Sequence, residues 1–180
     1  MKCTELLEQD HQLILRGVDV LEEMAARVKA GESVDPKHIQ SIVRFLRVFE
    51  DEHHQTKEES ALFPVLMKNS GAQYEKLRHI HFEHDQERSL AEGLEDALNT
   101  KSGPNFVHFA SRLAVLLREH IQKEESALFG LIEVSFSDDQ DDSVVAEFAR
   151  FDERFRSGKE ADALEDLCLL ESHYLRRRSA

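Results

Sequence analysis

The sequence contains an eleven-residue phrase twice, and each copy pairs a histidine with a glutamate four residues later. The first copy is HQTKEESALFP, starting at His54, and the second is HIQKEESALFG, starting at His120. In a helix, this spacing brings both side chains onto one face, about one turn apart. His54 with Glu58, and His120 with Glu124, both fall within apolar stripes. Burial there is costly unless a partner binds them, and a metal ion is the natural partner.

Two more histidines occupy matching places on the predicted helices before each phrase. The dipeptide Asp10-His11 corresponds to Glu83-His84 in the second half of the chain. The predicted ligands are therefore four imidazoles and two carboxylates: His11, His54, Glu58, His84, His120 and Glu124. This set has more ligands than a structural zinc site, which is usually closed by four. Six ligands suit two ions bridged by carboxylates. Imidazole with carboxylate favours iron, with manganese or zinc as substitutes.

Other side chains are candidates for additional ligands or for groups that orient the ligands: His81, Glu125, Glu50 and Glu87. Glu125 stands five residues after His120 and competes with Glu124 as a ligand. His81, three residues before His84, could either bind metal or support the histidine that does. The competing interpretations are an ordinary core histidine at position 11 and a solvent-exposed charged face around the two Lys-Glu-Glu segments.

Hydrophobic spacing predicts an all-α protein, an up-down-up-down four-helix bundle with one or more additional C-terminal helices. Apolar residues recur every three or four positions in segments near 4–30, 36–65, 73–99 and 106–131. Short connections between these segments favour antiparallel neighbours. We expect a metal-binding bundle at residues 1–136 and a helical extension at 137–180, broken near Ser157-Gly158 and packed on or beside the bundle.

Charge and cysteine content restrict the partners. The net charge is −13, with 23 Lys and Arg against 36 Asp and Glu, whereas nucleic-acid binding needs a basic face. Cys3 and Cys168 form no CxxC motif or disulfide framework, which favours a reduced compartment. No apolar run is long enough to span a membrane, and no signal peptide is evident at the N-terminus. We expect a cytoplasmic protein with neither nucleic-acid nor membrane partners.

The order of these motifs resembles the hemerythrin-like (HHE cation-binding) family over about residues 4–134. The similar residues are DH at position 10, HHxxKEExxLFP from His53, EH at position 83 and HxxxEExxLF from His120. The resemblance implies a four-helix bundle with an oxo- or hydroxo-bridged pair of iron ions, held by the same six ligands and bridged by the two glutamates. The family includes oxygen carriers, bacterial sensors of oxygen, redox state or iron, and di-iron proteins linked to repair of iron–sulfur clusters.

This chain departs from the oxygen carriers of that family. They have a further histidine where this sequence has Ile80, and their last carboxylate ligand lies five residues after its histidine, at the position of Glu125. The ligand pattern is therefore more similar to the repair-type proteins, although we expect no counterpart here of the separate cysteine-bearing N-terminal domain often found in them. The segment after about residue 137 has no clear family counterpart.

These observations predict a non-haem di-iron protein that binds or reacts with O2, NO or H2O2, in oxidative or nitrosative stress. One alternative is a regulatory module that senses oxygen, redox state or iron without turnover, with a protein partner bound through the C-terminal helices. Another is iron storage or delivery.

Overall fold

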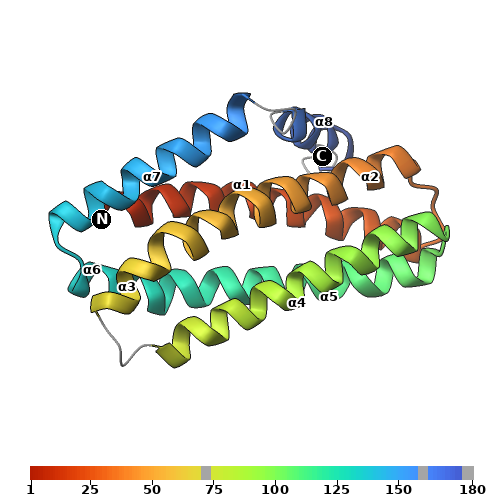
Figure 1. Cartoon of the computed structure of the whole chain (residues 1–180). Helices are drawn as coiled ribbons and strands as arrows, with labels where there is room; N and C mark the ends of the chain where they lie inside the picture. Colours follow the sequence, from red (N-terminus) through yellow and green to blue (C-terminus); the bar gives the residue numbers. More distant parts are fainter. Residues whose placement is uncertain (70–73, 158–161, 176–180) are drawn as a thin grey trace.

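The computed structural model describes residues 1–69, 74–157 and 162–175, and every regular element in these ranges is helical. The all-α prediction is therefore confirmed. The long elements run side by side in alternating directions, with two shorter helices on one side of them (Figure 1). The predicted break near Ser157-Gly158 falls at the edge of an undescribed range, and residues 176–180 also lie outside the described residues.

Four helical arms form the bundle within the described ranges. The first is α1 (Lys2–Lys29) and the third is α4 (Tyr74–Asn99). The second arm runs through α2 (Pro36–Phe45), η1 (Leu46–Gln55), η2 (Glu58–Leu62) and α3 (Phe63–Asn69). The fourth consists of α5 (Gly103–Lys123), η4 (Glu124–Leu128) and α6 (Phe129–Ser135). Side-chain caps start α2 and α5: Asp35 accepts from the Lys37 amide at 2.9 Å, and Ser102 from the Asn105 amide at 3.4 Å.

The second and fourth arms, which carry the repeated phrase, contain π-helical turns. The segments η1, η2 and η4 include His54, Glu58 and Glu124, and their wider i→i+5 bonding shifts the side chains relative to an ideal α-helix. Short π-helical insertions occur frequently at functional sites. The sequence pattern did not predict them.

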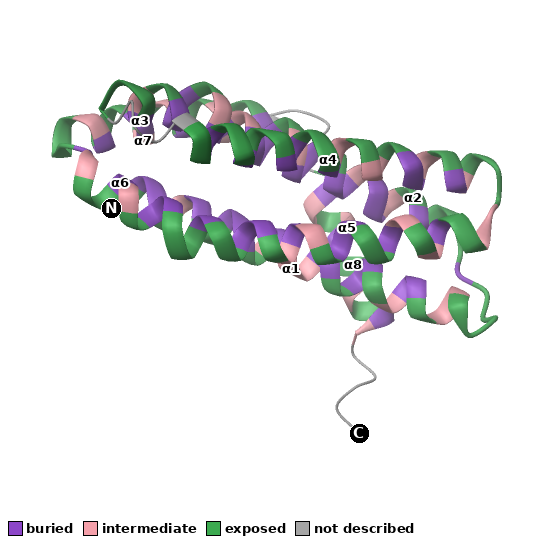
Figure 2. Ribbon diagram, turned by 90° about the horizontal axis from the view of Figure 1, so that it is seen from below, coloured by how far each residue is buried: buried purple, intermediate pink, exposed green. Residues whose placement is uncertain are grey.

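A polar layer separates two apolar clusters in the bundle interior. The first apolar cluster includes Cys3, Leu7, Leu62, Phe129 and Phe148. The second apolar cluster includes Val18, Leu21, Phe45, Leu113 and Leu117. Buried residues follow the inner faces of the long helices, as Figure 2 shows. The repeated histidines and glutamates lie on these same faces, so the fold brings them into the interior.

The two shorter helices, α7 (Asp138–Ser157) and α8 (Asp162–Tyr174), cover the side of the bundle made by the first two arms. α7 packs against α1, η1 and η2, and α8 packs against α1 and α2. Phe148 of α7 is buried in the first apolar cluster and Phe155 in the second. Arg16 of α1 holds Glu171 of α8 through two hydrogen bonds of 2.7 and 2.6 Å. No helix among the described residues is long and apolar enough to cross a membrane.

Asp141 of α7 is expected to stabilise the start of α1. Its two carboxylate oxygens accept hydrogen bonds from the backbone amides of Lys2 at 3.1 Å and Cys3 at 3.0 Å. Since these amides have no partner within α1, Asp141→Ala should lower the free energy of unfolding by about 1 kcal/mol, the usual value of a helix cap. Chemical denaturation would measure this change. Asp142→Ala, which removes only an exposed ion pair with the Lys2 ammonium, should leave stability unchanged; equal losses would contradict the capping role.

Candidate metal centre

All six predicted ligands meet in the polar layer between the two apolar clusters. They come from all four arms, and none is more than 3% exposed. The ligand side chains are His11 from α1, His54 from η1, Glu58 from η2, His84 from α4, His120 from α5 and Glu124 from η4. The pseudo-symmetric repeat in the sequence therefore becomes a pseudo-symmetric cluster in space.

The six side chains form two overlapping groups. In each group, one nitrogen or oxygen atom from every member lies within 4.8 Å of the others. The first group contains His11, His54, Glu58 and Glu124, and the second contains Glu58, His84, His120 and Glu124. The two glutamates belong to both. Such an arrangement can hold two cations, each with two imidazoles of its own and two shared carboxylates.

Each shared glutamate directs one oxygen towards each group. Glu124 Oε2 lies 3.2 Å from His11 Nε2, while its Oε1 lies 3.3 Å from His120 Nε2. Glu58 Oε1 lies 4.0 Å from His54 Nε2, while its Oε2 lies 3.4 Å from His84 Nε2. Among the described residues, none of these four oxygens has a hydrogen bond of acceptable geometry. Buried polar atoms are normally satisfied, so these residues fit a pair of bound cations.

Each of the four histidines is held through its other ring nitrogen by a carboxylate. The Nδ1 contacts are His11 to Glu125 at 2.9 Å, His54 to Asp10 at 3.5 Å, His84 to Glu59 at 2.7 Å and His120 to Glu83 at 3.0 Å. A carboxylate on Nδ1 places the proton there, orients the ring and leaves Nε2 free for a metal. The roles of Asp10 and Glu83 were not predicted from the sequence, although each residue directly precedes a predicted ligand.

Two further candidate ligands, Glu125 and His81, lie outside both of these groups. Glu125 contacts the outer nitrogen of His11, is 37% exposed on its side chain and belongs to neither group, whereas Glu124 belongs to both. His81 also lies outside the two groups, but with Glu59 and His84 it forms a third, less buried group that could hold a cation. Its side chain is 51% exposed, and its Nδ1 lies 3.4 Å from Glu59 Oε1, on the outer side of His84.

The sequence model of the hemerythrin HHE cation-binding domain matches residues 3–132. The chain belongs to this family. Membership implies a bound metal cation, typically iron, and the two His/Glu groups are where this hemerythrin domain can hold one. Searches of curated proteins and of solved structures returned no match. The helices α7 and α8 lie beyond the matched residues.

Beside the second group, the hemerythrin domain buries two further carboxylates. Gln55 donates hydrogen bonds to Glu50 and to Glu87, the latter at 2.8 Å. Burial and the neighbouring Glu87 raise the pKa of Glu50 well above its usual range. Burial likewise raises the pKa of Glu87 to about 7. Glu87 also lies 3.9 Å from His120 Nδ1, so the pair borders the ligand layer without entering either group.

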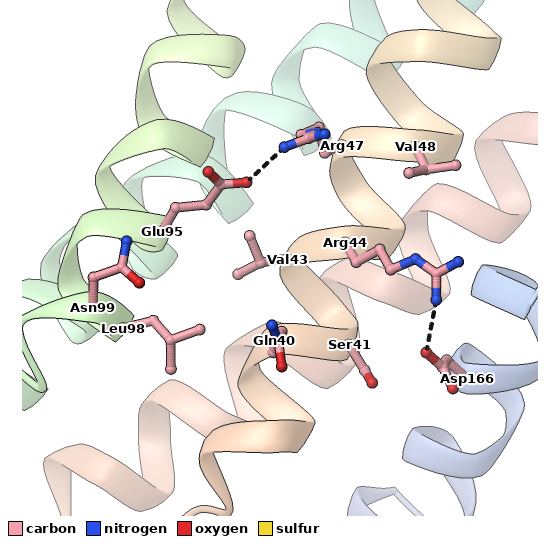
Figure 3. A pocket seen from close by; sticks show the side chains of 10 residues that line it. All are labelled: Gln40, Ser41, Val43, Arg44, Arg47, Val48, Glu95, Leu98, Asn99 and Asp166. Atoms are coloured by element: carbon pink, nitrogen blue, oxygen red, sulfur yellow. Dashed lines mark hydrogen bonds and ion pairs between the residues drawn. The ribbon is translucent and has the colours of Figure 1, made fainter. Parts of the chain in front are cut away.

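A surface hollow of about 560 Å³ lies elsewhere on the hemerythrin domain, between α2, α4 and α8 (Figure 3). None of the six predicted ligands lines it. Arg47 faces Glu95 at 3.4 Å, and Arg44 faces Asp166 at 3.9 Å. The hollow therefore presents arginines and carboxylates together, and it is separate from the candidate metal centre.

Metal uptake by the hemerythrin domain is expected to release protons. Burial opposes a charged His84, but the neighbouring Glu58 and Glu59 carboxylates outweigh it and raise the pKa to about 10. Because an ion binds the neutral imidazole, protons and metal compete for the site. Apparent affinity should therefore rise as the pH is raised towards about 10, the pKa of His84 in the metal-free protein. Calorimetric titration of metal-free protein in buffers of different ionisation enthalpy would count the protons. A pH-independent affinity without proton release would contradict this expectation.

Proposed function

We propose that this chain is a non-haem di-iron protein that binds or reacts with a small ligand, O2, NO or H2O2, in oxidative or nitrosative stress. The observation that carries the proposal is the sharing of Glu58 and Glu124 between two imidazole pairs, with one oxygen directed to each pair. Imidazole with carboxylate is a ligand set that suits iron, and bundle cores commonly hold carboxylate-bridged pairs. Bound iron would supply the redox chemistry and the open coordination positions.

The chain's own residues would hold the ions, orient the ligands and restrict water. The Nδ1 carboxylates fix the four rings, and the apolar clusters on both sides keep the layer dry. Ile80 stands at the place where the oxygen carriers have a further histidine. With Ala127 and Leu128, it lines an apolar hollow of about 380 Å³ between α4 and the fourth arm. This hollow supports approach by a small, weakly polar molecule from that side.

Metal content and an optical spectrum of protein purified without oxygen would test the proposal. We expect about two irons per chain, the stoichiometry of carboxylate-bridged bundle sites, and a new near-ultraviolet band after exposure to air. Zinc alone, or no metal after anaerobic iron loading, would refute it. Separate exposure of the reduced protein to O2, NO and peroxide would then identify the ligand. Rapid loss of iron to a competing chelator would favour iron delivery instead.

A regulatory module without turnover is the second candidate, because Asp152 of α7 lies 2.6 Å from Lys57, three residues after the predicted ligand His54. A regulatory role predicts that amide hydrogen exchange of α7 and α8 differs between the metal-free, reduced and oxidised forms. Identical exchange in all three forms would count against it.

A further inference from the structure

Helix α7 places a carboxylate at the level of the ligand layer. Phe148 is buried in the first apolar cluster and Phe155 in the second, so the residues between them lie alongside the polar layer. Asp152 lies in this stretch, and its side chain is only 23% exposed. Figure 1 shows α7 running along the same side of the bundle as α1 and the second arm.

A continuous chain of charged contacts leads from α7 to a predicted metal ligand. Asp152 Oδ1 lies 2.6 Å from Lys57 Nζ, which lies 2.8 Å from Asp10 Oδ2. The same Asp10 oxygen lies 3.5 Å from His54 Nδ1. Lys57 is 2% exposed, so water cannot readily replace either carboxylate. His53 also faces Asp152, with its Nε2 at 3.2 Å.

The other half of the site has the equivalent lysine, Lys123, but no described residue pairs with it in the way that Asp152 pairs with Lys57. Lys123 pairs with Glu83, which accepts from His120 Nδ1 at 3.0 Å. Its side chain is 45% exposed, and Glu83 is the carboxylate paired with it among the described residues. The sequence repeat is therefore nearly symmetric, whereas the electrostatic surroundings of the two imidazole pairs are not.

We propose that Asp152 is a positioning residue that makes the two metal positions inequivalent, by sharing Lys57 with Asp10 and so leaving Asp10 available to His54. The proposal rests on the proposed pair of metal ions. An ammonium group has three N–H donors and can serve both carboxylates. Without the Asp152 charge, the Lys57 ammonium pairs with Asp10 alone, and the hydrogen bond that His54 Nδ1 donates to Asp10 weakens. His54 then becomes a poorer and less well oriented ligand, which affects the first group and leaves the second unchanged.

The test is an anaerobic calorimetric titration of metal-free protein with Fe(II). Wild type is compared with Asp152→Asn. One binding phase should weaken by about tenfold or more, the usual effect of removing a group that orients a ligand, and the other should stay unchanged. Asp10→Asn should weaken the same phase, whereas Glu83→Gln should weaken the other. Glu153→Gln removes the same charge from an exposed neighbour on α7 and should alter neither phase.

Mössbauer spectra of the iron-loaded protein provide a second readout. Asp152→Asn should shift the signal of one iron only, and Asp152→Glu should restore it. Asp152→Ser serves as the test variant if Asp152→Asn does not fold. Unchanged phases and spectra, or equal weakening of both phases, would overturn the inference while leaving the proposed function intact. Failure of the wild type to bind a pair of ions would instead refute the proposed function and the inference with it.

Discussion

Glu124→Gln is expected to abolish retention of both metal ions. Glu124 directs one oxygen to each imidazole pair, so its loss removes a ligand from both positions at once. An amide is also a much weaker ligand than a carboxylate and leaves the positive charge of the ions less balanced. Iron content after anaerobic loading and gel filtration should fall from about two per chain to well below one. Metal analysis with the near-ultraviolet spectrum would measure it.

The matched control is the adjacent residue, because Glu125→Gln changes the same functional group one position later in the chain. Glu125 contacts the outer nitrogen of His11 and lies outside both groups. The substitution Glu125→Gln should weaken metal binding by about ten- to a hundredfold, while the number of ions bound at saturation stays unchanged. If Glu125→Gln lost both ions and Glu124→Gln kept them, the assignment of ligand and supporting residue would have to be reversed.

Lys57→Met is expected to be among the most destabilising single substitutions in the chain. Lys57 is 2% exposed and separates two carboxylates, Asp10 and Asp152. Asp10 is itself buried, yet hydrogen bonds and charge from His54 and Lys57 lower its pKa to about 2. Removing the ammonium leaves uncompensated negative charge in the interior, which costs about 3–5 kcal/mol. Denaturant unfolding of the metal-free protein would measure the loss separately from any effect on metal binding.

Lys123→Met is the symmetry-related control. Lys123 occupies the same position in the second phrase, but its side chain is 45% exposed, and its buried partner Glu83 also contacts His120 at 3.0 Å and His79 at 3.2 Å. Lys123→Met should cost about 1–3 kcal/mol, the usual penalty for removing one partner of a buried acceptor, and therefore less than Lys57→Met. Similar losses for both variants would show that burial of Lys57 does not determine its contribution. The comparison also tests the solvent-exposed interpretation of the Lys-Glu-Glu segments, which the burial of Lys57 contradicts.

Much of the architecture could be predicted because it depends on spacing within single helices. The four-residue interval from His54 to Glu58 fixes a common face whatever the rest of the chain does. The repeat then predicts that a second helix presents the same face, and the apolar stripe predicts that this face is buried. The six candidate ligands do meet in the structure. That they bind metal, and that the metal is a pair of irons, remains a prediction.

Other features could not be predicted because they depend on how the arms approach one another. The π-helical turns at His54, Glu58 and Glu124 are one such feature, because the composition of the phrase does not reveal them. Both Glu124 and Glu125 lie about one turn after His120, and the rotation of η4 relative to α1 places Glu124 between the imidazole pairs and Glu125 at the outer nitrogen of His11.

The sequence by itself determined the all-α class, the family and the set of residues that could hold a cation. Only the tertiary structure decided which carboxylate holds which histidine and how the C-terminal helices contribute. Asp152 lies far along the chain from His54, and no periodicity within α7 relates them. Helical periodicity is local, because it follows from backbone geometry over a few turns. Contacts between distant segments depend on packing of whole helices, which only the folded chain defines.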